Sequence, residues 1–261
     1  MRIVNKTYNI GINKTIVLIS DIHYLDKRDI KHLNKVLDRI KKIKPDYICI
    51  PGDITESANP KDPDKFINWL EELGTICKVI ISIGNHEYYI SKKNNEFGFN
   101  NDLYGQIKSL KNIYVLDNEN IIFDNINFMG TTFSKEYYFE YAENEPNFND
   151  YLKNIKSNKK CYNVLLCHSP LKIIDEDVIN KINVDLVLCG HMHGGMVPRI
   201  LRPIIKHGGF ISPTKKLFPK YTYGNKKINN TNIITTSGIC VLPKGLGILT
   251  NLYSSEIVII K

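Results

Sequence analysis

Five short apolar runs, each followed by a group of His, Asp or Asn residues, constrain the fold of this chain more than any other feature of its sequence. The five runs cover residues 15–20, 47–51, 78–83, 164–167 and 186–189. Continuous stretches of Val, Ile and Leu are typical of β-strands that are buried on both faces. In open α/β sheets, ligands bind outside the carboxyl ends of such strands. We therefore expect an α/β fold in which the polar groups converge on one edge.

The segments between the runs indicate helices. Residues 29–43 place apolar side chains near helical spacing, and Lys, Arg and Asp fill the other positions. Asp62 and Pro63 are suited to cap and begin a second helix, which Gly74 would end. Two further helical stretches are expected over residues 149–156 and 171–181. The first three strands and their two helices would form a βαβαβ unit.

Shorter runs later in the chain indicate additional strands. They cover residues 112–116, 120–123, 125–129, 232–236 and 256–260. Asp124 and Asn125 lie between two of these runs and are typical residues of a hairpin turn. Because hairpin strands are antiparallel and strands joined by helices are parallel, we expect a mixed sheet.

Composition and length indicate one globular domain over residues 1–261. The chain has 261 residues, 43% of them hydrophobic, and no Pro-, Gly- or Ser-rich linker divides it. Its first residues lack the apolar core of a signal peptide, and no run reaches the roughly 20 apolar residues of a membrane span. We therefore expect a cytoplasmic protein, with any membrane contact peripheral and at the inner face. The six cysteines include no Cys-x-x-Cys pair, so we expect them to be small buried residues.

The positive charge of the chain is concentrated in residues 199–227, which we call the basic loop. The chain has 35 Lys and Arg residues against 27 Asp and Glu, a formal excess of +8. The basic loop holds eight cationic residues and no acidic one: Arg199, Arg202, Lys206, Lys215, Lys216, Lys220, Lys226 and Lys227. The whole formal excess therefore lies in this segment, which also contains apolar and aromatic residues and three prolines.

The basic loop begins six residues after His193, beside one of the polar groups. A basic and aromatic segment of this kind suits an anionic substrate, a nucleic acid or a lipid surface. Its candidates for binding a substrate are Arg199, Arg202 and His207. A solvated loop without a partner is the alternative, because runs of charge are common on protein surfaces.

The polar groups supply imidazole, carboxylate and amide donors in numbers suited to two metal ions. The seven candidate ligands are Asp21, His23, Asp53, Asn85, His168, His191 and His193. At the end of a strand, Asp21 and His23 would point the same way because strand side chains alternate. A buried polar network without metal is the alternative, but seven convergent polar groups would then bear large desolvation costs. The sequence therefore predicts a dinuclear metallohydrolase.

Taken together and in order, these motifs resemble those of the calcineurin-like metallophosphoesterases. The motifs are Asp21-x-His23, Gly52-Asp53, Gly84-Asn85-His86-Glu87, a lone His168 after a strand, and Gly190-His191-x-His193. They cover residues 15 to 195. The resemblance implies a four-layer α/β/β/α sandwich with two mixed β-sheets. It also implies that one metal binds to Asp21, His23 and His193, and the second to Asn85, His168 and His191, with Asp53 bridging the two.

The resemblance further implies a mechanism. Two ions about 3.5–4 Å apart lower the pKa of a shared water, and the resulting hydroxide attacks phosphorus. The nitrogen and oxygen donors suit Mn, Fe, Zn, Co or Ni better than Mg or Ca. His86 is similar to the histidine of the family that stabilises the transition state or protonates the leaving group. Glu87 is expected either to support a ligand or to cap the segment that follows.

Departures from the patterns of family branches bear on the substrate. Residues 54–57, Ile-Thr-Glu-Ser, replace the Asp-Arg-Gly that follows the Gly-Asp pair in Ser/Thr protein phosphatases, which argues against that activity. Gly194-Gly195 and the closing Ser255-Glu256-Ile257 resemble a bacterial branch that includes membrane-associated phosphohydrolases and a lipid A precursor pyrophosphatase. Met196 stands where that branch often has Gln, so the branch does not fix the substrate.

The leading hypothesis is therefore hydrolysis of a phosphoester or pyrophosphate bond in a small, lipid-linked or other anionic substrate. A nuclease or cyclic nucleotide phosphodiesterase would use the same metals and is the second hypothesis. A non-catalytic binding scaffold is the third, although a scaffold would need neither His86 nor all seven ligands. The expected partners are a phosphorylated small molecule or lipid and an anionic membrane surface, with nucleic acid the weaker expectation.

Overall fold

The computed structural model describes residues 1–57, 59–88, 101–133, 138, 152–171, 173–174, 176–240 and 252–261. Within these ranges the chain forms two six-stranded β-sheets. In spatial order, the first sheet contains β1 (Arg2–Tyr8), β12 (Ser254–Ile260), β2 (Ile16–Leu18), β3 (Tyr47–Pro51), β4 (Lys78–Ser82) and β5 (Ile113–Leu116). The second contains β10 (Gly224–Ile228), β11 (Thr231–Thr235), β9 (Leu186–Cys189), β8 (Tyr162–Cys167), β7 (Ile126–Thr131) and β6 (Asn120–Phe123).

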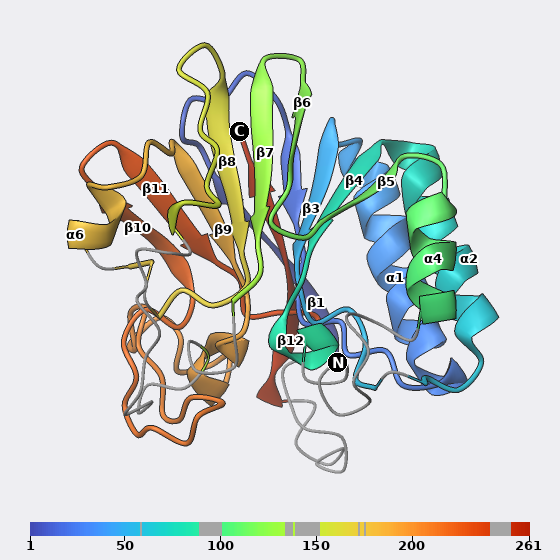
Figure 1. Ribbon diagram of the computed structural model, residues 1–261. Helices are drawn as coiled ribbons and strands as arrows, with labels where there is room; N and C mark the ends of the chain where they lie inside the picture. Colours follow the sequence, from blue (N-terminus) through green and yellow to red (C-terminus); the bar gives the residue numbers. More distant parts are fainter. Residues whose placement is uncertain are drawn as a thin grey trace.

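Both sheets are mixed, as expected. Strands β2 to β5 are parallel, and β12 runs antiparallel to β2 and parallel to β1. In the second sheet β7, β8, β9 and β11 are parallel, whereas the edge strands β6 and β10 are antiparallel to their neighbours. The carboxyl ends of β3, β4, β8 and β9 lie at the same end of the molecule, at the bottom of Figure 1.

Helices cover the outer face of the first sheet (Figure 1). They are α1 (Lys27–Ile43), α2 (Pro63–Ile76) and α4 (Asn101–Ser109). The outer face of the second sheet packs against Ile173, Ile179 and Ile182, which belong to α6 (Glu176–Ile179) and the turns around it. The predicted helix over residues 171–181 is thus reduced to the four residues of α6. The other helix predicted on this side extends into residues 149–151, outside the described ranges. The α/β/β/α arrangement with two mixed sheets is confirmed.

Alternation along the buried strands divides the apolar side chains between separate cores. In β8, Val164 and Leu166 pack between the sheets, whereas Leu165 and Cys167 pack under the outer layer of the second sheet. Strand β9 divides its residues in the same way. Each of these strands is covered on both faces. The side chains that point to either face are therefore apolar. This packing explains the continuous apolar runs of the sequence.

Most predicted strands and helices are confirmed, and three further details differ from the prediction. Gly74 does not end α2, which continues to Ile76; the absence of a side chain at Gly74 instead admits the Lys111 carbonyl oxygen, which a Cβ atom would meet at 2.5 Å. The edge strand β1 was not predicted. Strand β10 takes residues 224–227, so the irregular part of the basic loop ends at Tyr223.

All six cysteines are free. Cys49, Cys167 and Cys189 are buried as expected, whereas Cys77, Cys161 and Cys240 are only partly buried. Among the described helices, each is too short or too polar to cross a lipid bilayer. The single domain over residues 1–261 stays a prediction.

Candidate metal centre

The seven candidate ligands come together where the strands of the two sheets end. His168 directly follows β8, Asp53 comes two residues after β3, and Asn85 comes three residues after β4. The position of Asp21 and His23 differs from the expectation, because β2 already ends at Leu18. Alternation along a strand therefore does not orient these two residues. The backbone N–H of His23 instead donates to the Asp53 carbonyl, 3.1 Å away.

The candidate ligand atoms form overlapping groups whose members lie within 4.8 Å of one another. One group contains Asp21, His23 and His193, and another contains Asp53, His168 and His191. A carboxylate oxygen of Asp53 lies 3.0 Å from His168 Nε2 and 3.8 Å from His23 Nε2, so it reaches both groups. The Asp53 side chain thus lies where a bridging ligand would lie.

Asn85 joins the second group, as its Oδ1 atom lies 3.1 Å from His168 Nε2. The structure therefore gathers all seven residues around one place, in the two sets that the sequence motifs suggest. Their role as metal ligands stays a prediction.

Two of the candidate histidines are oriented by hydrogen bonds at Nδ1, and a third lies against a carboxylate. His168 donates from Nδ1 to the Pro51 carbonyl at 2.6 Å, and His193 donates to the Cys240 carbonyl at 2.8 Å. His23 Nδ1 lies 2.7 Å from a carboxylate oxygen of Glu56. With Nδ1 directed to these oxygens, Nε2 is the nitrogen of each ring that faces the other candidate ligands, the arrangement usual for histidines that bind metal.

Buried nitrogen atoms without hydrogen-bond partners provide a test of this orientation. Nε2 of His23 and Nε2 of His191 are both buried and have no partner among the described residues. An unpaired polar atom in the interior is costly unless another group satisfies it. Two such nitrogens beside two buried carboxylates, Asp21 and Asp53, fit divalent cations of the transition-metal type.

The electrostatics of the centre also favour positive charge. Burial lowers the pKa of His168, but the adjacent Asp53 carboxylate outweighs burial and raises the pKa of His168 to about 10. Burial would raise the pKa of Asp53, yet His168 and His23 hold it well below its usual value. Burial and His168 lower the pKa of His191 to about 3, so His191 stays neutral and its ring nitrogen can bind a metal.

Glycines allow the loops of the centre to approach one another closely. A Cβ atom on Gly52 would lie 2.5 Å from Gly84 Cα and 2.8 Å from His168 Nδ1. A Cβ atom on Gly190 would lie 2.5 Å from an Asp21 carboxylate oxygen. Both distances are far below normal contact, so a larger residue at either position would displace the candidate ligands.

Five of the seven candidate ligands adopt left-handed backbone conformations. Asp21, His23, Asp53, His191 and His193 have φ values of 51°, 49°, 51°, 67° and 47°. Residues other than glycine adopt such values infrequently, and Asp and His are among the types enriched there. Sparsely populated conformations persist when the surrounding structure imposes them. The geometry of the centre is therefore set by tertiary contacts.

Glu87 supplies several of these contacts. Its buried carboxylate accepts hydrogen bonds from the backbone N–H groups of Asp53, Ile54, Thr55 and Gly84, at 2.8, 2.9, 3.2 and 2.9 Å. The loop that carries Asp53 is thereby joined to the loop that carries Asn85. Glu87 thus supports the ligands through the backbone, one of the two roles that the sequence suggested.

His86 lies at the accessible side of the centre. Its side chain is 31% exposed, and its ring meets the His23 ring edge-on with centroids 4.6 Å apart. The backbone N–H of His86 donates to Asp53 Oδ1 at 2.9 Å, and its Nδ1 lies 3.3 Å from the Glu56 carbonyl oxygen. A histidine that is anchored at the ligands but open to solvent can reach a bound substrate.

Two residues that contact the centre belong to none of the sequence motifs. Glu56 contacts His23 Nδ1, although its segment suggested only a departure from protein phosphatases. Tyr138 is buried, and its ring centroid lies 5.5 Å from that of His191 and 5.9 Å from that of His168. No motif marked Tyr138, because its contacts depend on the fold rather than on its sequence neighbours.

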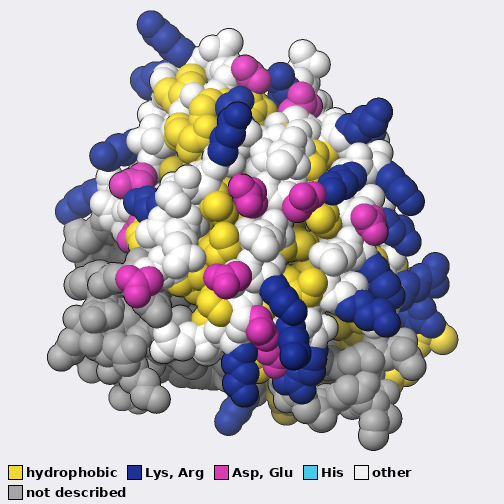
Figure 2. Space-filling model, turned by 90° about the vertical axis from the view of Figure 1, so that its right-hand side faces the viewer, with side chains coloured by type: hydrophobic (Ala, Val, Ile, Leu, Met, Phe, Trp, Pro, Cys, Tyr) yellow, Lys and Arg dark blue, Asp and Glu magenta, His cyan; other side chains and the backbone are white. Residues whose placement is uncertain are grey.

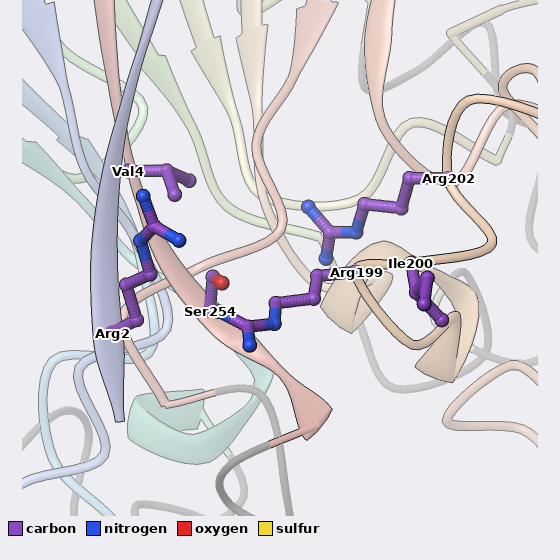
Figure 3. A pocket seen from close by; sticks show the side chains of 6 residues that line it. All are labelled: Arg2, Val4, Arg199, Ile200, Arg202 and Ser254. Carbon is purple, nitrogen blue, oxygen red and sulfur yellow. The ribbon is translucent and has the colours of Figure 1, made fainter.

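The three predicted substrate-binding residues lie in the basic loop and differ in their surroundings. Arg199 is exposed and lines a pocket of about 450 Å³ together with Arg2, Arg202 and three other residues (Figure 3). Arg202 is mostly buried and forms an ion pair of 3.1 Å with Glu256. His207 is exposed and donates from Nδ1 to the Tyr223 carbonyl at 3.0 Å. Their role in binding substrate stays a prediction.

Comparisons with known proteins agree with this geometry. Residues 14–195 match the model of the calcineurin-like phosphoesterase family. An uncharacterized metallophosphoesterase of Campylobacter jejuni is 25% identical over 207 residues, which cover 78% of this chain and 50% of that protein. An uncharacterized metallophosphoesterase of Aquifex aeolicus is 30% identical over 180 residues, which cover 64% of this chain and 61% of that protein.

Some of these relatives are longer. The chain spans about half the length of the Campylobacter protein and 45% of a similar protein of Helicobacter pylori. Among solved structures, the NAD nucleotidase of Haemophilus influenzae aligns with a TM-score of 0.46 at 15% identity, covering 86% of this chain and 45% of that one. Because the family model matches more than half of the sequence, this chain belongs to the calcineurin-like phosphoesterase family.

Proposed function

We propose that this protein is a dinuclear metal-dependent phosphohydrolase, which cleaves a phosphoester or phosphoanhydride bond. The observation that carries the proposal is the buried Asp53 carboxylate, which reaches both groups of candidate ligands. Membership in a family of phosphoesterases supports the same class of reaction. In this proposal one ion is held by Asp21, His23 and His193, and the other by Asn85, His168 and His191.

Two divalent ions at such a site activate water for attack on phosphorus and offset the negative charge of the phosphoryl oxygens. The nitrogen and oxygen donors suit Mn, Fe, Zn, Co or Ni. The protein keeps these donors in place through Glu87, Glu56 and the Nδ1 hydrogen bonds. His86 is exposed enough to contact the leaving-group oxygen and to donate a proton to it. That proton leaves with the product alcohol or phosphate, and the imidazole takes up another proton from solvent.

The proposed substrate is an anionic phosphorylated small molecule or lipid. The positive charge of the basic loop supports this choice. The loop follows His193, and its Phe210 N–H donates to the Gly195 carbonyl at 2.8 Å. A diesterase, including a nuclease or cyclic nucleotide phosphodiesterase, would use the same metal ligands. We also propose the cytoplasmic location expected from the sequence, which cell fractionation would test.

Hydrolysis of two synthetic substrates by the metal-loaded protein tests the reaction. We expect turnover of p-nitrophenyl phosphate after loading with Mn²⁺, and two metal ions per chain by elemental analysis. Preference for bis-p-nitrophenyl phosphate would instead assign the site to diesters. The absence of turnover of both substrates with each of the five metals, in protein that has bound two ions, would contradict the proposal and favour a binding scaffold.

A further inference from the structure

The basic loop folds as a hairpin on the surface of the protein. The Thr222 N–H donates to the His207 carbonyl at 2.8 Å, and the Ser212 N–H donates to the Lys216 carbonyl at 2.9 Å. Between these contacts, the Phe218 N–H donates to the Phe210 carbonyl at 3.1 Å. Near the start of the loop, the buried Arg202–Glu256 ion pair fixes it to β12. Its exposed side chains are therefore presented by a defined backbone.

Apolar side chains are unusually exposed on this loop. Ile200 is 77% exposed, Ile204 76%, Leu217 65% and Phe218 73%. With Phe210, the loop carries five of the seven large apolar side chains that are exposed in the described part of the chain. Several exposed apolar residues on one ordered loop are costly in water and typical of a surface that binds a partner.

Exposed cations accompany these apolar side chains. Lys206, Lys215, Lys216 and Lys220 are all exposed, and the basic loop contains no Asp or Glu. The helical face of the molecule differs, because Figure 2 shows Asp and Glu side chains scattered among its Lys and Arg. A loop that exposes both apolar side chains and lysines complements a surface that is negatively charged outside and apolar beneath.

The arginine pocket beside the loop offers a site for a single anionic group. Arg2 on β1 and Arg199 and Arg202 on the basic loop extend toward the same space (Figure 3). Glu256 neutralises Arg202, which leaves the two exposed guanidinium groups to bind an anion. The hydroxyl of Ser254, which also lines the pocket, is buried and has no hydrogen-bond partner among the described residues. Guanidinium groups bind phosphate with paired hydrogen bonds.

We infer that the basic loop docks on an anionic lipid bilayer, with its apolar side chains entering the interface and the arginine pocket binding a lipid headgroup phosphate. A bilayer explains the aliphatic residues Ile200, Ile204 and Leu217, which nucleic acid would not require. The loop lies at the end of the sheets where the candidate ligands lie (Figure 1). Docking would therefore bring the metal centre close to the membrane surface.

Cosedimentation of the full chain with vesicles tests this inference without any enzyme assay, so its outcome is separate from that of the proposed function. The vesicles contain either equal parts of phosphatidylglycerol and phosphatidylcholine or phosphatidylcholine alone. At low salt we expect binding to the first and little to the second, with binding that weakens as salt rises.

Three variants, two of them with a control, identify the surface. The triple variant K215Q/K216Q/K220Q should bind the anionic vesicles about 100-fold more weakly, since each lysine near such a surface contributes about fivefold. The matched control K31Q/K35Q/K42Q removes the same charge from the exposed side of α1 and should have a much smaller effect. L217S/F218S should also weaken binding, whereas I122S on β6, which is 45% exposed, should not. R2Q/R199Q should reduce the preference for phosphatidylglycerol.

Several results would overturn the inference. These are equal binding to both kinds of vesicle, no binding at low salt, or equal losses in the two triple variants. Tight binding to duplex DNA without vesicle binding would assign the surface to nucleic acid instead. Unchanged lipid preference in R2Q/R199Q would overturn the assignment of the pocket.

Discussion

Left-handed backbone occurs at both ends of the parallel strands, but for different reasons. At one end, Asp124 and Asn125 have φ values of 49° and 62° and form the turn between β6 and β7. Two consecutive residues of this kind make the hairpin turn whose twist matches that of its strands, so the conformation is favoured locally. At the other end, candidate ligands such as Asp53 have the same conformation without such a turn.

The difference shows where the energy for the site geometry arises. In the hairpin, the left-handed conformation is stabilised by the turn residues themselves and the two strands that they join. The ligand loops are instead held by contacts far away in sequence, such as the carboxylate of Glu87 on the Asp53 N–H and the ring of His168 on the Pro51 carbonyl. Asp-to-Asn changes at both ends compare the two situations directly, because Asn also tolerates a left-handed backbone.

The largest expected effect follows Asp53→Asn. This variant keeps the backbone conformation but removes the negative charge that reaches both groups of ligands. We expect metal content to fall to near zero and phosphoester hydrolysis to fall to background, as measured by elemental analysis and p-nitrophenyl phosphate turnover. Asp124→Asn is the matched control and should keep both. Two bound ions in Asp53→Asn would contradict the bridging position of this residue.

His86→Ala should have the next largest effect, a fall in turnover of about 10²–10⁴-fold with metal content unchanged. The backbone N–H of residue 86, which donates to Asp53, survives the substitution, so the ligands should stay in place. A proton donor matters most when the leaving group is a strong base. The loss should therefore be larger for an alkyl phosphate than for p-nitrophenyl phosphate. Equal losses for the two substrates would argue against proton donation by His86.

Glu56→Gln should weaken metal binding by about 10–100-fold, the usual effect of removing a carboxylate that orients a metal-binding histidine. The amide oxygen can still accept a hydrogen bond from His23 Nδ1, but it lacks the charge that makes the imidazole more basic. Isothermal titration with Mn²⁺ measures this change. Glu72→Gln removes an exposed glutamate that pairs with Lys41 and should leave the affinity unaltered. An unaltered affinity for Mn²⁺ in Glu56→Gln would contradict a role of Glu56 in positioning His23.

The same contrast explains how far the sequence could predict the structure. The bounds of β3, β6 and β9 and the turn at Asp124-Asn125 followed from local patterns, and they are confirmed. The sequence could also predict that the seven candidate ligands share one site. Most of them closely follow a buried strand, and parallel strands end at the same edge of a sheet.

Features that depend on contacts between distant segments could not be predicted. Glu56 reaches His23 across 33 positions of sequence, and Tyr138 reaches His191 across 53. Strand β1 has little apolar pattern of its own. Within the described sheet it is an edge strand that pairs with β12, near the other end of the chain. The left-handed conformation of Asp21 and His23 replaced the expected alternation for the same reason, because tertiary hydrogen bonds determine it.

The smallest expected effect concerns the hairpin end. Tyr47 donates a hydrogen bond to Asp124 at 2.7 Å and Lys14 lies 3.0 Å from the same oxygen; these contacts lower the pKa of Asp124. A carboxyl whose pKa is lower in the folded state stabilises the protein fully above its unfolded pKa of about 3.9, and this contribution disappears as pH falls through the folded value. Asp124 is well exposed, so solvent and salt screen the interaction.

Thermal unfolding of Asp124→Asn against the unchanged chain measures this contribution. The variant should melt at a slightly lower temperature at pH 7, and the difference should close in acid below the folded pKa of Asp124. Added salt should also reduce the difference at pH 7. A difference that stayed constant from neutral pH into acid would show that the hairpin depends on the shape of the residue rather than its charge.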